Sequence, residues 1–71
     1  MKWDQIKGNW TQWKGSARAQ WGEITDDELQ EAKGEREQLV GLIQKKYGKA
    51  RQEAEEEVDR WQAKLLSLIH I

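Results

Sequence analysis

The chain has 71 residues, and 35% of them are charged, which fits one small domain near the lower size limit for a single hydrophobic core. It contains neither Cys nor Pro, so a disulfide framework and a cysteine-based metal site are excluded. Twelve basic and thirteen acidic residues leave a net charge of −1, whereas a dedicated nucleic-acid binder is usually more basic. No signal peptide or membrane-spanning stretch is visible, and we expect a cytoplasmic protein without membrane association.

The first segment, up to Gly22, is predicted to be one amphipathic helix. Its large apolar residues follow spacings of three and four, which places them on one helical face: Trp3, Ile6, Trp10, Trp13, Ala17 and Trp21. Glycine weakens a helix by about 1 kcal/mol relative to alanine. We therefore expect fraying before about residue 8, a close backbone approach to a neighbour at Gly15, and a C-terminal cap at Gly22.

The next segment begins with a helix N-terminal signal. Thr25 and Glu28 have the spacing of a capping box, and Ile24 and Leu29 have that of a hydrophobic staple. These residues predict a short helix over about 26–32, which ends near Gly34.

Two further helices are predicted in the second half. The first covers about 35–47, turns Leu39, Val40, Ile43 and Tyr47 inward, and is capped by Gly48. The second begins near Lys49. Its apolar stripe comprises Ala50, Ala54, Val58, Trp61 and Leu65, and its opposite face is densely charged.

The two halves of the chain repeat one pattern. Lys7-Gly8-x3-Gln12-Trp13-x-Gly15-x5-Trp21-Gly22 recurs 26 residues later as Lys33-Gly34-x3-Gln38-Leu39-x-Gly41-x5-Tyr47-Gly48. The repeat predicts an all-α fold of four short helices, arranged as two crossed helical hairpins with approximate internal duplication. The expected core comprises Trp10, Trp13, Trp21, Leu29, Leu39, Ile43, Tyr47, Val58 and Trp61.

Residues 1–65 are predicted to form the domain, and residues 66–71 differ from it in character. The run Leu66-Ser67-Leu68-Ile69-His70-Ile71 is an apolar tail after a charged helix. It is similar to a translated transposase end sequence, and we interpret it as an artefact of sequence assembly or a truncated end.

Together these motifs resemble the CsbD-like family of small bacterial stress-response proteins. The matching residues are Gly8-x-Trp10-x2-Trp13-Lys14-Gly15, Gln20-Trp21-Gly22-x-Ile24-Thr25-Asp26-Asp27, Gly34-x4-Leu39-Val40-Gly41-x-Ile43-Gln44-x2-Tyr47-Gly48 and Ala54-Glu55-x2-Val58. They cover about residues 5–61. The resemblance implies a four-helix fold similar to SAM domains, induction under general or osmotic stress, and a cytoplasmic location. It supplies no catalytic residues.

Neither catalysis nor a cofactor is indicated. The single histidine, His70, lies in the tail. Capping explains the acidic run Asp26, Asp27 and Glu28 better than metal binding does. No nucleophile has a partner base, and no glycine-rich phosphate loop follows a strand. We expect no catalytic, cofactor-binding or metal-binding residue, and no enzyme.

Nucleic-acid binding is the sharper alternative. Basic residues lie beside aromatic ones on the first helix and cluster at the junction of the last two: Lys7, Lys14, Arg18, Lys45, Lys46, Lys49 and Arg51. Such groups can neutralise phosphates and stack bases. A protein-interaction module is the second alternative. The favoured interpretation is a non-enzymatic, monomeric stress-response protein of the hydrophilin type, which protects other macromolecules when water is lost.

Overall fold

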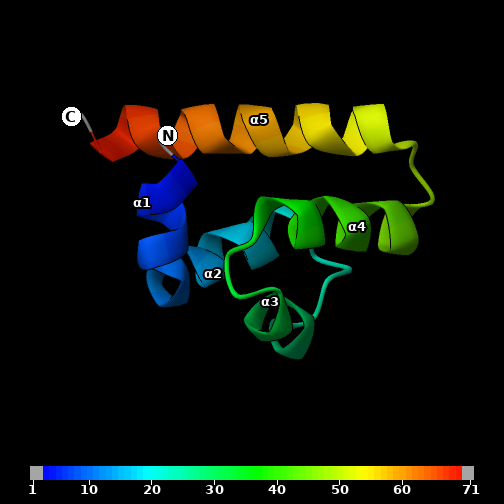
Figure 1. The fold of residues 1–71 in the computed structure, drawn as a ribbon, viewed down its shortest axis with the longest axis horizontal. Helices are drawn as coiled ribbons and strands as arrows, with labels where there is room; N and C mark the ends of the chain where they lie inside the picture. Colours follow the sequence, from blue (N-terminus) through cyan, green and yellow to red (C-terminus); the bar gives the residue numbers. More distant parts are fainter. Residues whose placement is uncertain (1–2, 70–71) are drawn as a thin grey trace.

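The computed structural model describes the backbone of residues 3–69 and the side chains of residues 3–65, and helices joined by short loops make up this part of the chain (Figure 1). Its five helices are α1 (Trp3–Gly8), α2 (Trp10–Gln20), α3 (Asp26–Ala32), α4 (Arg36–Tyr47) and α5 (Arg51–Ile69). The side chains of residues 66–71 lie outside the described part, so the interpretation of the tail stays a prediction.

Each helix packs against the next one in the chain, and α4 lies between α3 and α5. Helix α5 is the longest and runs antiparallel to α4, and α3 lies on the other side of α4 (Figure 1). Helix α2 packs mainly against α3, and α1 packs against α2 near the C-terminal half of α5. Short connections join successive helices, as is usual for neighbouring antiparallel helices.

The prediction of a single first helix was wrong, because the helix is interrupted at Asn9, between α1 and α2. The backbone of Asn9 leaves the helical region at φ −118° and ψ 34°, and its side-chain amide donates to the Gln5 carbonyl at 3.1 Å. Asparagine favours such local hydrogen bonds over continued helix. The predicted fraying was also wrong, because Trp3 and Ile6 are buried and anchor α1. The fold therefore has five helices in the described range instead of four.

Four indole rings form the centre of the core. Trp61 contacts the rings of Trp3, Trp10 and Trp21 edge to face, with centroid distances of 6.0, 6.3 and 5.3 Å. Such pairs contribute about 0.5–1.5 kcal/mol each beyond their buried area. Aliphatic side chains from α1, α3, α4, α5 and the α2–α3 loop complete this core: Ile6, Ile24, Leu29, Leu39, Val40, Ile43, Val58 and Leu65.

Three of the four indoles have a hydrogen-bond acceptor elsewhere in the fold. Trp3 donates to the Gly34 carbonyl at 2.8 Å, Trp10 to the Leu29 carbonyl at 2.7 Å, and Trp21 to the Glu57 carboxylate at 3.0 Å. The ring nitrogen of Trp61 is buried without an oxygen or nitrogen acceptor in the described part of the chain. Burial of the other three rings thus leaves their indole N–H groups satisfied, and each bond fixes one segment relative to another.

Most residues predicted for the core are buried, with two differences. Trp13 is partly buried and packs against the core from its edge. Tyr47 was expected inside, but 37% of its surface is exposed. Its position at the last residue of α4 places it beyond the core. There its hydroxyl accepts a hydrogen bond from the Glu23 N–H at 3.1 Å, and its ring lies 5.9 Å from the Lys49 ammonium.

The roles predicted for Gly15 and Gly22 are not found, whereas the role predicted for Gly48 is. Gly22 is not the cap of α2, because Trp21 holds that position with φ −125° and donates its N–H to the Ala17 carbonyl. A methyl group at Gly15 would meet nothing within 4 Å, so no backbone approaches it. Gly48 does cap α4, in the left-handed conformation with φ 65°.

The close approach occurs at Gly34 instead. Lys33 and Gly34 both have positive φ, 56° and 78°, and they turn the chain from α3 into α4. A Cβ atom at Gly34 would lie 3.0 Å from the Cα of Lys7 and 3.3 Å from the Cβ of Trp10. Only glycine permits both this conformation and this contact with α1.

We predict that Gly34→Ala destabilises the protein by about 1–3 kcal/mol, since it adds backbone strain and a clash with α1. The matched control is Gly41→Ala, inside α4, where an added methyl group meets nothing within 4 Å. That change should stabilise the protein by about 0.5–1 kcal/mol. Urea unfolding of both variants measures the difference, and equal effects would contradict the assigned role of Gly34.

Candidate functional site

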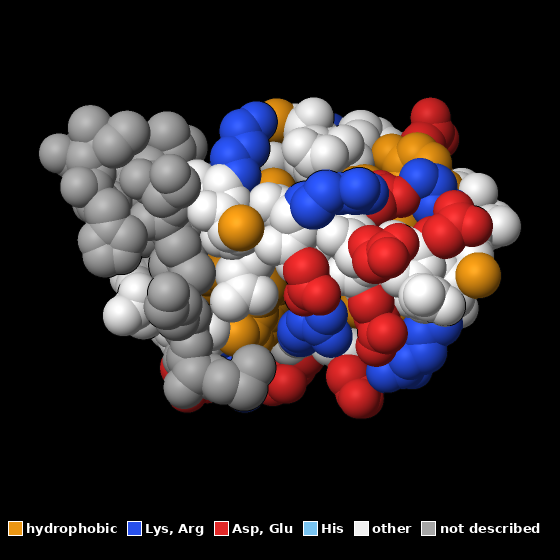
Figure 2. All heavy atoms as spheres, turned by 90° about the horizontal axis from the view of Figure 1, so that it is seen from above, with side chains coloured by type: hydrophobic (Ala, Val, Ile, Leu, Met, Phe, Trp, Pro, Cys, Tyr) orange, Lys and Arg blue, Asp and Glu red, His pale blue; other side chains and the backbone are white. Residues whose placement is uncertain are grey.

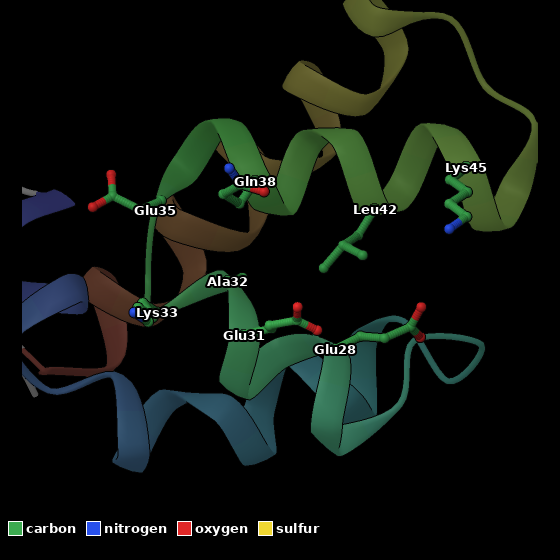
Figure 3. A pocket seen from close by; sticks show the side chains of 8 residues that line it. All are labelled: Glu28, Glu31, Ala32, Lys33, Glu35, Gln38, Leu42 and Lys45. Atoms are coloured by element: carbon green, nitrogen blue, oxygen red, sulfur yellow. The ribbon is translucent and has the colours of Figure 1, made fainter.

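A groove lies between α3 and α4 in the described surface (Figure 3). It has a volume of ≈ 480 Å³ and is lined by Glu28, Glu31, Ala32, Lys33, Glu35, Gln38, Leu42 and Lys45. Leu42 points from α4 toward α3, and charged side chains of both signs stand around it. The lining contains no Ser, Thr, Cys, His or Tyr, so it offers no hydroxyl, thiol or imidazole for nucleophilic catalysis.

The acidic run at the start of α3 serves the helix itself. The Thr25 hydroxyl accepts from the Glu28 N–H at 3.2 Å, and the Glu28 carboxylate accepts from the Thr25 N–H at 3.0 Å, which completes the capping box. Lys46 lies 2.9 Å from the same carboxylate. The bond from the Thr25 backbone, and then Lys46, lower the pKa of Glu28. No group of three or more His, Cys, Asp or Glu side chains within the described residues is placed to hold a metal ion.

Most of the basic residues considered for nucleic-acid binding have acidic partners within the fold. Lys7 pairs with Glu35, which raises the pKa of Lys7. Lys46 pairs with Glu28, and Lys49 with Glu57. These contacts direct the ammonium groups toward neighbouring elements of the same chain.

Two more of these residues are engaged in the same way. Lys14 lies 3.6 Å from Asp26 and donates to the Gln30 side chain at 2.7 Å. Arg51 contacts Glu55 at 3.2 Å and Glu37 at 3.5 Å. Arg18 and Lys45 have no ion-pair partner among residues 3–65. Trp10 is buried and Trp13 is partly buried, so of the two aromatic residues beside these basic groups only Trp13 presents part of its ring at the surface.

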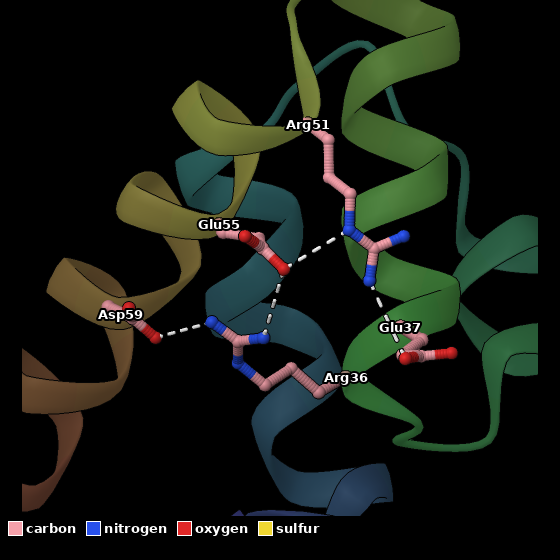
Figure 4. A network of polar contacts seen from close by, with 5 residues as sticks. All are labelled: Arg36, Glu37, Arg51, Glu55 and Asp59. Carbon is pink, nitrogen blue, oxygen red and sulfur yellow. Dashed lines mark hydrogen bonds and ion pairs between the residues drawn. The ribbon is translucent and has the colours of Figure 1, made fainter.

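A network of ion pairs joins α4 to α5, and sequence reasoning missed it (Figure 4). Arg36 lies 2.6 Å from Asp59 and 3.9 Å from Glu55, and Arg51 reaches both Glu55 and Glu37. We call these five residues the α4–α5 clasp. The sequence shows only that one face of the last helix is densely charged. Its partners are identifiable only once the register between the two helices is known.

Glu57 is a second residue that the sequence did not single out. Its carboxylate accepts from the Trp21 indole at 3.0 Å and from the Lys49 ammonium, and only 15% of its side chain is exposed. Lys49 is the larger cause of the lowered pKa of Glu57, and Trp21 adds to it. Glu57 therefore links the core indoles to the surface charges.

Comparison with known proteins identifies the family. The CsbD-like family profile matches residues 4–56, so the chain belongs to the CsbD-like family. UPF0337 protein ECA0631 of Pectobacterium atrosepticum is 52% identical over 62 residues, which cover 87% of this chain and 90% of the relative. UPF0337 protein YjbJ of Escherichia coli K12 is 45% identical over 64 residues, 90% of this chain and 93% of the relative.

A third relative, a UPF0337 protein of Bordetella pertussis, is 51% identical over 55 residues, 78% of this chain and 83% of the relative. None of these names specifies a substrate, ligand or partner. No solved structure matches the chain. No helix in the described range is both long and apolar enough to cross a membrane.

We predict that Glu57→Gln lowers stability by about 1 kcal/mol at neutral pH, because the charge-assisted bonds to Lys49 and Trp21 weaken. The pKa of Glu57 is lower in the folded state than its ordinary value of 4.5. Its stabilising effect is therefore fully present above that value and is lost as the pH falls through the folded pKa.

Unfolding curves of wild type and Glu57→Gln, measured from neutral pH to below the folded pKa, should converge at the acidic end. Glu56→Gln is the matched control, since Glu56 is exposed and has no ion-pair partner among residues 3–65. A constant difference between wild type and Glu57→Gln across the pH range would show that the ionised carboxylate is not the source.

Proposed function

We propose that this protein is a non-enzymatic stress-response protein of the hydrophilin type, which protects other macromolecules when water is lost. Membership of the CsbD-like family supports the general stress role. We further propose that the protein is located in the cytoplasm and is a monomer. Support for the protective action comes from the distribution of aromatic and charged side chains.

The observation that carries the proposal is the contrast between the core and the surface. Trp3, Trp10, Trp21 and Trp61 are at most 7% exposed, and among the described residues Tyr47, at 37%, is the only well-exposed large hydrophobic side chain. Figure 2 shows one face on which acidic and basic side chains are interspersed and hydrophobic surface occurs only in small separate areas. Large contiguous apolar patches on a protein surface often mark a site for a specific partner.

A surface of this kind favours weak contacts with many neighbours. Charged side chains of both signs keep their hydration, and a net charge of −1 produces no strong long-range field. Mixed charges thus limit both self-association through apolar patches and tight binding to one oppositely charged partner. As water is removed, such a molecule can remain between other proteins as a hydrated spacer.

The nucleic-acid alternative receives less support. Five of its seven candidate residues already have acidic partners, and a phosphate would have to compete with each of these carboxylates. A specific protein-interaction surface would have to be built around Tyr47 and the half-buried Leu42 and Trp13.

We also propose internal duplication as the origin of the fold. The 26-residue offset relates Trp10, the first residue of α2, to Arg36, the first residue of α4. The same offset relates Asp26, which begins α3, to Gln52, one residue after the start of α5. The pairs α2–α3 and α4–α5 are also the most extensively packed. This correspondence supports two related helical hairpins.

We predict that the protein preserves the activity of a labile enzyme such as lactate dehydrogenase through freeze–thaw and drying. Remaining activity after rehydration is the measurement. An equal mass of ubiquitin, a compact globular protein of similar size, is the control. Equal protection by ubiquitin would remove the support for a specialised role.

Tyr47→Gln separates the protectant from the protein-interaction alternative. This change removes the large exposed hydrophobic side chain while the core indoles stay in place. A protectant that acts through its hydrated charged surface should keep its full effect. A loss of most of the protection would indicate that apolar contact with the client carries the activity.

A further inference from the structure

The ion pairs of this fold almost all connect different parts of the chain. Of the eight ion-pair contacts among residues 3–65, Arg51–Glu55 alone lies within one helix. The other seven link α1 to the start of α4, α2 to α3, α3 to α4, and α4 or the following loop to α5. The ion pairs therefore stabilise the packing of the helices against one another, and they contribute little to the stability of each helix alone.

We propose that the α4–α5 clasp makes the fold respond to ionic strength: a rise in monovalent salt releases α5 from α4 and shifts the protein toward a more open form. This inference does not depend on the protective role, since it concerns the equilibrium between two forms of the molecule. The clasp consists of Arg36, Glu37, Arg51, Glu55 and Asp59, and Figure 4 shows how two guanidinium groups bridge three carboxylates between the helices.

The clasp is open to dissolved ions. The side chains of Asp59, Arg51 and Glu37 are 61%, 57% and 82% exposed, and Arg36 is 26% exposed. Ion pairs at such exposure are screened by salt, because the Debye length falls from about 30 Å at 0.01 M to about 3 Å at 1 M. Buried pairs would be screened far less.

The charge balance makes the direction of the effect definite. With twelve basic and thirteen acidic residues, the chain has almost no net repulsion that salt could relieve. We therefore expect screening to weaken attractions between the helices more than it relieves repulsion. Each exposed pair is worth little, but a network of several pairs matters in a domain of 71 residues with a small core.

Release of α5 would be visible at the core. Trp61 lies on α5, and its ring contacts Trp3, Trp10 and Trp21, which belong to α1 and the α2 region. When α5 moves away from α4, these ring contacts loosen as well. Tryptophan fluorescence thus reports the same event as the loss of helix packing.

The test is thermal unfolding by circular dichroism and tryptophan fluorescence at about 0.02 M and about 0.5 M NaCl, on either side of a Debye length of ~10 Å. We expect the midpoint of the full chain to fall by about 5 °C or more at the higher salt concentration. Sucrose at the same osmolality should not lower it, because excluded osmolytes favour the compact state. A midpoint that is unchanged or higher in NaCl would overturn the proposal.

Paired variants assign the effect to the clasp. The double variant Arg36→Gln/Arg51→Gln removes its cations, and its midpoint should depend on salt less than half as strongly as that of wild type. The control Arg18→Gln/Lys64→Gln makes the same change in net charge at exposed residues without an ion-pair partner among residues 3–65. It should keep the wild-type salt dependence. Equal salt dependence in both variants would exclude the clasp as the origin.

Discussion

Burial of the Trp61 ring among three other indoles is the interaction on which the rest of this structure depends. The four rings are the largest side chains in the core, and edge-to-face packing requires defined angles between them. The rings come from α1, α2, the residue after α2, and α5, so one cluster fixes helices that are distant in sequence. Their indole hydrogen bonds then fix the α3–α4 turn and α5 against this centre.

Local rules predicted the helices well and their relative placement poorly. The capping box at Thr25 and the left-handed cap at Gly48 follow from short-range geometry, and the structure contains both. The all-helical class and the CsbD-like family were likewise identified from the residues alone, and both are confirmed. The break at Asn9 was missed because the apolar spacing of the first segment continues through it. A periodicity in sequence cannot show where the backbone turns.

Features that depend on two distant segments could not be predicted in this way. Gly34 matters because Lys7 lies against it, and no local pattern distinguishes it from Gly15. The clasp depends on the register between α4 and α5, which places Arg36 opposite Asp59. The spacing of Tyr47 from Ile43 places it on the buried face of the helix, yet the end of α4 lies beyond the core. In each case tertiary geometry, and not residue type, decides the role.

The close packing of the four indoles also affects the circular-dichroism spectrum of this protein. Aromatic rings this close together share their electronic excitation, and coupled transitions give paired circular-dichroism bands of opposite sign in the far ultraviolet. These bands overlap the helical signal, so the helix content calculated from such a spectrum would deviate from the helix content of the structure. The same coupling gives an optical signature of the closed core, which is lost when Trp61, the ring common to all three pairs, leaves the cluster.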